Sequence, residues 1–180
     1  ITKEEKMANN FYKLALGGIF AIIVIGGYMA FTGYANDVYP LDQSVGFLDR
    51  IVATSDPQSI IADINSIKAN LPETGNPVWI FPTDSTNFAR IQADLDTMLI
   101  SAEKIAAVPT DSAAYHTGML DINSRSVLIQ ENIADAIPYM YVSFSNIIFS
   151  SIWIAAILGI FAVLNKKKQK MQEYDVSKDV

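Results

Sequence analysis

The 180-residue chain contains no cysteine, and this absence removes several classes of chemistry at once. Without thiols, the protein has no disulfide, no thiolate nucleophile and no cysteine-ligated iron–sulfur cluster. Histidine occurs once, as His116, so the chain alone cannot supply the histidine and cysteine ligands of a usual zinc site. No glycine-rich phosphate loop is evident either. We therefore expect no catalytic residue, no metal site, no cofactor and no enzymatic activity of this chain alone.

Charge is absent from two long apolar runs, residues 14–36 and 136–165. A helix needs about 20 apolar residues to cross a hydrocarbon core of ~30 Å, and both runs exceed this length. Buried core helices of a soluble protein are the alternative, but these are usually shorter and interrupted by polar residues. A cleaved signal peptide would have a shorter apolar region, of about 7–15 residues. The sequence thus predicts transmembrane helices at residues 14–36 and 139–165.

Lysine is concentrated before the first apolar run and after the second. The lysines there are Lys3, Lys6, Lys13, Lys166, Lys167, Lys168, Lys170 and Lys178. Only Arg50 and Arg125 lie within about 20 residues of the other two ends of the runs. Basic residues beside a membrane span are retained on the cytoplasmic side. We therefore expect a two-span protein of the cell membrane with residues 1–13 and 166–180 cytoplasmic and residues 37–138 extracytoplasmic. The predicted cytoplasmic anchor is Lys166, Lys167, Lys168 and Lys170.

The predicted outer segment is acidic. Residues 33–142 carry 14 acidic and 5 basic side chains, a net charge of −9. Such a surface repels nucleic acid and anionic lipid, and it would attract cationic small molecules or metal ions. Simple solubility explains the same charge equally well. Nucleic acid is therefore not an expected partner.

Turn signals divide the outer segment into four parts, and each part has helical periodicity. The breaks lie at Asp56-Pro57, residues 71–85 and residues 108–111. Apolar residues recur in alternating steps of three and four, which places one apolar seam on each helix. The predicted seams are Leu41, Val45, Leu48 and Val52; Ile60, Ile64, Ile67 and Leu71; Phe88, Ile91, Leu95, Met98, Ala102 and Ile105; and Tyr115, Met119, Ile122, Ser126, Ile129, Ile133, Ala136 and Met140. The sequence thus predicts an all-α fold, in which two transmembrane helices flank an extracytoplasmic up-down-up-down four-helix bundle.

Helix ends can be predicted from capping residues and proline. Asp56 is expected to cap the second segment, with Pro57 at its first helical position. For the later segments the candidate caps are Asp84, Ser85 or Thr86 and Thr110 or Asp111. Pro138 is expected to kink the chain between the bundle and the second span, because it has no N–H to donate.

The loop at residues 71–85 carries an apolar triplet, Trp79, Ile80 and Phe81. The up-down order returns this loop to the membrane side of the bundle. There the triplet is a candidate for docking into the lipid headgroup region or onto a neighbouring subunit. The alternative is that the three side chains cap the bundle's own core.

Small and polar residues mark both apolar runs as candidate helix-packing surfaces. Gly26 and Ala30 are four residues apart, and so are the members of a second ridge: Ser151, Ala155 and Gly159. Small residues allow helix backbones to approach closely in lipid. Ser143, Asn146 and Ser150 form a polar stripe beside the ridge. Asn146 is expected to bond another helix or to meet water at the interface. Neither run contains a charged residue, which argues against a pump or transporter.

Two functions remain open after these exclusions. The first is a non-catalytic accessory subunit, with other integral membrane subunits and bilayer lipid as its partners in a hetero-oligomer. The cysteine-free composition rich in Ile, Asn, Ser and Asp, the two spans and the Lys-rich tail, with the stretch "WIAAILGIFAVLNKKKQK" (153–170), resemble small helical accessory subunits of the archaeal ammonia monooxygenase complex. That resemblance implies copper chemistry in other chains. The second is a sensor. The order of span, outer bundle and span over residues 11–165 resembles the ligand-binding half of bacterial chemoreceptors. Such a sensor would need a separate output partner.

Overall fold

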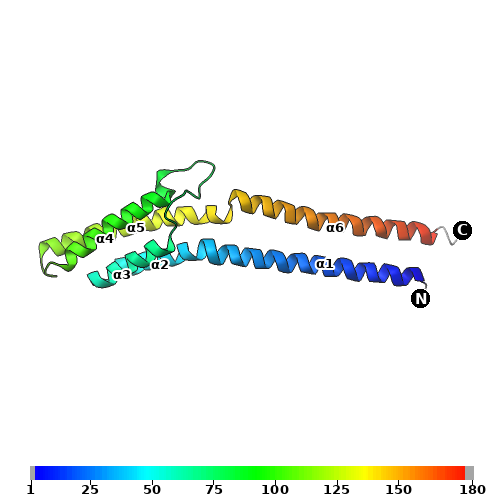
Figure 1. Cartoon of the computed structure of the whole chain (residues 1–180), viewed down its shortest axis with the longest axis horizontal. Helices are drawn as coiled ribbons and strands as arrows, with labels where there is room; N and C mark the ends of the chain where they lie inside the picture. Colours follow the sequence, from blue (N-terminus) through cyan, green and yellow to red (C-terminus); the bar gives the residue numbers. More distant parts are fainter. Residues whose placement is uncertain (1–2, 177–180) are drawn as a thin grey trace. The chain divides into compact units, whose positions relative to one another are not determined.

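The structure is a computed structural model that describes the backbone of residues 3–176 and the side chains of residues 11–143 and 146–169. Every regular element in that part of the chain is a helix, so the predicted all-α class is confirmed. The α-helices are α1 (Lys3–Gly33), α2 (Tyr39–Ala53), α3 (Pro57–Asn70), α4 (Phe88–Ala106), α5 (Ala113–Tyr141) and α6 (Phe144–Val176) (Figure 1). A π-helix, η1 (Tyr34–Val38), joins α1 to α2, and a short 3-10 helix, η2 (Asp84–Thr86), precedes α4. The chain divides into two compact units, residues 33–144 and the segments on either side of them.

Helices α2 to α5 pack around one hydrophobic core in the first unit. Helix α2 contacts α3 and α5, and α4 contacts the same two helices, so each helix has two neighbours. The predicted seams of α3 and α4 are buried throughout, and in α5 only Met119 and Met140 are partly rather than fully buried. The core therefore follows from the spacing of apolar residues along three of the four helices.

In α2 the structure corrects one predicted seam position. Val52 is exposed, and its neighbour Ile51 is fully buried in its place. Ser44 is fully buried as well, and its hydroxyl donates a hydrogen bond to the carbonyl oxygen of Pro40 at 2.8 Å. A serine that bonds its own helix can enter a core because its polar group is satisfied there. The spacing of apolar residues does not predict that such a serine is buried.

The start of α3 agrees with the sequence. Asp56 caps the helix and Pro57 occupies the first turn. The Asp56 carboxylate accepts hydrogen bonds from the backbone N–H groups of Gln58 and Ser59, at 3.2 and 3.1 Å. The Ser59 hydroxyl also donates to it, at 2.6 Å, and these bonds lower the pKa of the Asp56 side chain. The cap is therefore in its charged, accepting form at neutral pH.

The other two caps lie later in the chain than predicted. Asn87 caps α4 and accepts from the backbone N–H of Ala89 at 3.0 Å. Ser112 caps α5 and accepts from the backbone N–H of Tyr115 at 3.1 Å. The residues predicted for these roles lie in η2 (Asp84, Ser85 and Thr86) or in the turn before Ser112 (Thr110 and Asp111). Each loop offers several side chains able to cap, and composition alone does not choose among them.

Pro138 does not end α5. The helix continues through it to Tyr141, and the backbone N–H of Val142 donates to the Pro138 carbonyl oxygen at 3.2 Å. The kink expected at Pro138 stays a prediction, and the helical path is interrupted at Val142 and Ser143, before α6 begins at Phe144. A proline lacks a donor, but its carbonyl still accepts, so the turn that follows it can form normally.

Helices α1 and α6 form the second unit, in which they run antiparallel. Trp153 of α6 contacts Ile22 of α1, and Lys167 contacts Phe11 near the opposite ends of the two helices. The helices have 31 and 33 residues, so both extend beyond the apolar runs from which they were predicted. By length and composition, both are long and apolar enough to cross a membrane.

Candidate functional site

A single tryptophan makes a close contact between α1 and α6. The indole of Trp153 lies against Gly26, where an added Cβ would be only 2.8 Å from the ring. Its Nε1 donates to the carbonyl oxygen of Ile22 at 3.0 Å. This bond satisfies the only polar group of the side chain, which is otherwise costly to hold in an apolar region. Gly26 was predicted from the small-residue spacing, whereas Trp153 was not, because one aromatic residue inside an apolar run gives no periodic signal.

The small-residue ridge of α6 lies mostly on another face. Ser151 and Ala155 are each two residues from Trp153, which places them about 160° away around the helix. Both are exposed, as are Ala30, Asn146 and Ser150. Gly159 borders the groove described next. Ser151 and Ala155 are therefore turned away from the Trp153 contact, and the role of the predicted packing surface stays a prediction.

An apolar groove of about 440 Å³ separates the two helices beyond the Trp153 contact. Its lining includes Phe11, Leu14 and Gly18 from α1 and Gly159, Ile160 and Val163 from α6, and every lining residue is apolar. An added Cβ at Gly18 or Gly159 would meet no atom within 4 Å. The glycines therefore leave open space instead of bringing the two backbones into contact.

The predicted lysine anchor lies at one end of this groove. Lys167 places its Nζ 3.4 Å from the centroid of the Phe11 ring, a cation–π contact. Lys166 and Lys168, on either side of it, are exposed. Lys170 belongs to the same helix, and its side chain lies outside the described residues. Helix α6 does not end where the apolar run ends, so these lysines are presented on a rigid helix.

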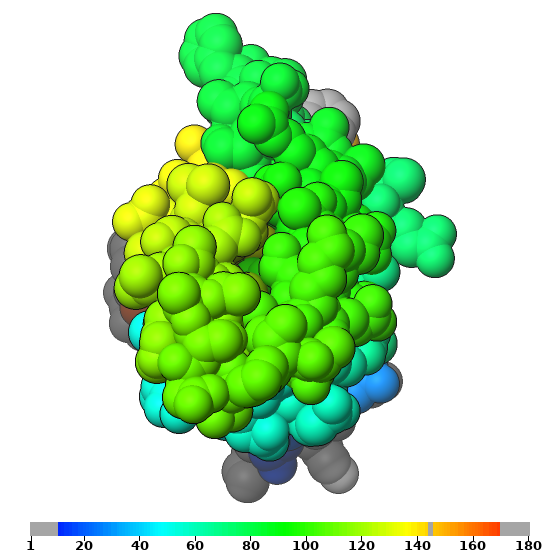
Figure 2. All heavy atoms as spheres, turned by 90° about the vertical axis from the view of Figure 1, so that its left-hand side faces the viewer, coloured from blue at the N-terminus to red at the C-terminus, as the bar shows by residue number. Residues whose placement is uncertain are grey.

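The loop that joins α3 to α4 stands out from the helices around it (Figure 2). Its apolar triplet is accessible, with Trp79, Ile80 and Phe81 exposed by 42%, 55% and 82%. Val78, the residue before the triplet, is the one that is buried. The indole Nε1 of Trp79 donates to the carbonyl oxygen of Val142 at 2.8 Å. The loop is thus attached to the residues that connect α5 to α6, and docking by the triplet stays a prediction.

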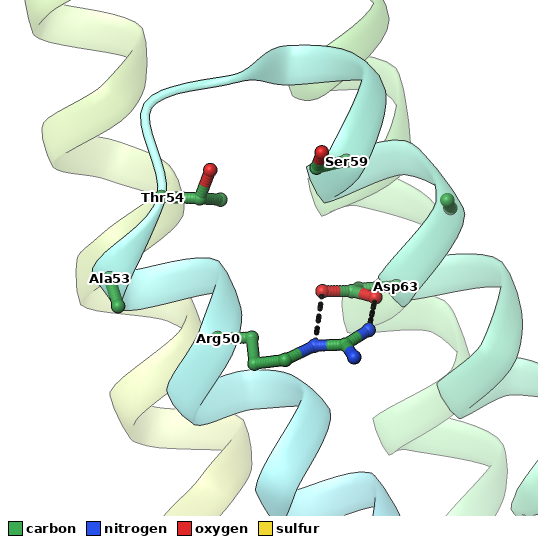
Figure 3. Close-up of a pocket in the computed structure, with 6 residues that line it drawn as sticks. Arg50, Ala53, Thr54, Ser59 and Asp63 are labelled. Carbon is green, nitrogen blue, oxygen red and sulfur yellow. Dashed lines mark hydrogen bonds and ion pairs between the residues drawn. The ribbon is translucent and has the colours of Figure 1, made fainter.

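A second cavity, of about 570 Å³, lies where α2 meets α3. Arg50 and Asp63 both line it, and two hydrogen bonds run from the guanidinium to the carboxylate (Figure 3). The Asp63 side chain is only 9% exposed, whereas Arg50 is 62% exposed. The bonds to Asp63 raise the pKa of the Arg50 guanidinium. The cation is therefore occupied by an internal partner, which leaves a weak site for an anionic ligand.

No protein-family model, curated protein or solved structure matches this chain. Among the described residues, no group of three or more histidine, cysteine, aspartate or glutamate side chains is placed to hold a metal ion. His116 is exposed on α5, and its ring meets the edge of the Tyr115 ring at 5.8 Å between centroids. The candidate sites are accordingly two separate surfaces, the α1–α6 pair in one unit and the exposed loop in the other.

Proposed function

We propose that the protein is a non-catalytic two-pass membrane subunit that stabilises or assembles a larger membrane complex. In this proposal α1 and α6 cross the bilayer, both termini are cytoplasmic, and α2 to α5 form an extracytoplasmic up-down-up-down bundle. Its partners are other integral membrane subunits, in a hetero-oligomer, and the surrounding lipid. The complex proposed first is the archaeal ammonia monooxygenase, on the sequence resemblance alone. The copper chemistry would then belong to other chains.

Exposed apolar side chains support the membrane placement. Leu16, Phe20, Ile152 and Leu158 are among many large apolar residues that α1 and α6 expose. In each helix, no residue of the most apolar 18-residue stretch is buried. In water, a continuous apolar surface of this length would associate or aggregate, whereas a bilayer solvates it.

Lysine and tryptophan support the orientation. The anchor lysines follow the apolar part of α6, on the side that the positive-inside rule assigns to the cytoplasm. At the other end of that helix, Trp79 is bonded to Val142, two residues before α6 begins. Tryptophan favours the headgroup layer. We infer that Ile80 and Phe81 meet the outer headgroup layer beside the second span.

The observation that carries the subunit proposal is the direction of the α6 ridge. The contact with α1 is made by Trp153, which leaves Ser151 and Ala155 on nearly the opposite side of α6. In lipid, helices associate through close packing of small residues and through polar groups, not through apolar character. A small-residue ridge facing away from its own hairpin partner is the kind of surface that a helix of another subunit would pack against.

Assembly in the native membrane tests this proposal. The full chain is purified in mild detergent from its source membrane, and the chains that migrate with it are identified. Ala155→Leu should lower the yield of the complex at least about tenfold, because loss of close packing worth ~1.4 kcal/mol has that effect. Gly27→Leu is the matched control, since an added side chain at Gly27 meets nothing within 4 Å and lies outside the ridge. A chain that purifies alone, or equal yields from both variants, would contradict the proposal.

A sensor that signals through a separate partner is the second candidate, and the Arg50 cavity is the observation that favours it. The cavity is within the size range of small-molecule sites, about 300–1,000 Å³. Helical turns also run without a break from α1 through η1 to α2, which carries Arg50. Identification of the co-purifying chains separates the two functions. A kinase-linked partner favours the sensor, and a stoichiometric membrane enzyme favours the accessory subunit.

A further inference from the structure

The groove between α1 and α6 is lined by residues without polar side chains. Its described lining is wholly apolar, and its volume of about 440 Å³ is in the range of specific small-molecule sites. Water would find no hydrogen-bonding partner there, and stable buried waters need two to four. The occupant that fits such a lining is a hydrocarbon chain.

The charge at one end of the groove restricts the occupant further. Phe11 lines the groove and also contacts the ammonium group of Lys167, so a cation lies at the groove's end. Lys166 and Lys168 extend the positive charge along α6, and Lys13 is exposed on α1. No acidic residue occurs in α1 or α6 between Phe11 and Gln169 that would neutralise them. A ligand with an apolar tail and an anionic head would complement both parts of the site.

We propose that this groove is a binding site for one anionic phospholipid of the inner leaflet, with an acyl chain over Gly18 and Gly159 and its phosphate at Lys166 and Lys167. The inference rests on the proposed membrane placement and deepens it. Basic pockets between membrane helices on the cytoplasmic side are suited to acidic headgroups. The two glycines have a clear physical role here, because any side chain at either position would occupy the space of the acyl chain.

The test measures which lipids the full chain retains. The protein is placed in nanodiscs of equal phosphatidylglycerol and phosphatidylcholine with identical acyl chains, and the bound lipid is identified by native mass spectrometry. Wild-type protein should retain phosphatidylglycerol in preference. Replacing Lys166 and Lys167 by glutamine should reduce that preference about fivefold for each lysine. Equal retention of the two lipids by wild-type protein would overturn the proposal.

The acyl-chain part of the proposal has its own matched pair of variants. Gly18→Leu fills the groove and should remove the retained lipid. Gly17→Leu adds the same volume one residue away, outside the groove lining, and should leave the lipid in place. The same lipid content in both variants would overturn the site. The proposal would also be overturned if Gly18→Leu abolished the binding of a partner chain or of a second copy and left lipid retention unchanged.

Alkaline carbonate extraction tests the proposed membrane subunit independently of the lipid site. If carbonate releases the wild-type chain from its membrane, the proposed membrane subunit itself is wrong. If the chain stays in the membrane pellet but retains no selected lipid, only the lipid site is wrong.

Discussion

At Gly118, α5 approaches α4 so closely that a side chain does not fit. An added Cβ would lie 2.2 Å from Cγ2 of Ile105, and Ile105 is β-branched and therefore stiff at this point. We expect Gly118→Ala to lower the free energy of unfolding by about 1–3 kcal/mol, the usual cost of overpacking. Urea unfolding of the full chain in mild detergent, followed by circular dichroism, measures this value.

Gly46 is the matched control for Gly118. It also lies inside a helix, but an added Cβ there would meet nothing within 4 Å. Gly46→Ala should therefore raise the free energy of unfolding by about 0.5–1 kcal/mol, because alanine loses less backbone entropy in a helix. Destabilisation of similar size in both variants would show that the close approach at Gly118 is not the cause.

Single residues of the core were predictable where apolar character and spacing agree. Every predicted seam residue of α4 is buried, and the predicted serine of the α5 seam, Ser126, is buried with its hydroxyl donating to Sδ of Met98 at 3.4 Å. Ser44 was missed because its burial depends on a hydrogen bond to its own backbone. The helix caps Asn87 and Ser112 were missed because neighbouring residues have the same capping chemistry.

The loop between α3 and α4 is the element whose role the sequence left open. Ile80 and Phe81 are largely exposed, so removing them should cost the fold little. We expect Ile80→Ser with Phe81→Ser to change the free energy of unfolding by less than about 0.5 kcal/mol. Leu95→Ala, in the fully buried seam of α4, should cost about 2–5 kcal/mol in the same urea experiment. A loss in the double variant as large as in Leu95→Ala would mean that the triplet caps the core.

The sequence predicted that α1 and α6 exist, but it did not predict which of their faces contact each other. The apolar runs indicated α1 and α6, but the contact between them depends on how each helix is rotated about its axis. Small residues suggested packing at Gly26 and along the α6 ridge, whereas the structure places the large ring of Trp153 on Gly26. A pattern of small residues does not say which large side chain fills the space that they leave.

At the scale of the whole molecule, the two units have different kinds of surface. Residues 33–144 bury their apolar seams in a core and carry an acidic exterior, whereas α1 and α6 expose apolar residues over most of their length. The spacing of apolar residues that predicts the buried seams of residues 33–144 therefore does not describe α1 and α6. An acidic exterior is suited to water, whereas a long exposed apolar surface is suited to lipid or to another protein. This contrast is what the proposed membrane placement of α1 and α6 explains.

The absence of native cysteine makes the orientation of the chain directly measurable. Asp111 lies in the turn before α5, and Gln169 lies on α6 beyond the anchor lysines; both are exposed. If the lysines hold both tails inside, a membrane-impermeant maleimide should label Asp111→Cys in intact cells and Gln169→Cys only after the membrane is disrupted. Protein without any cysteine gives the background. Labelling of Gln169→Cys in intact cells would reverse the orientation, and labelling of neither variant there would remove the extracytoplasmic bundle. If only Asp111→Cys is labelled in intact cells, the result agrees with both proposed placements. Trp79 would then lie at the outer headgroup layer, and the lysines of the lipid groove would lie at the inner one.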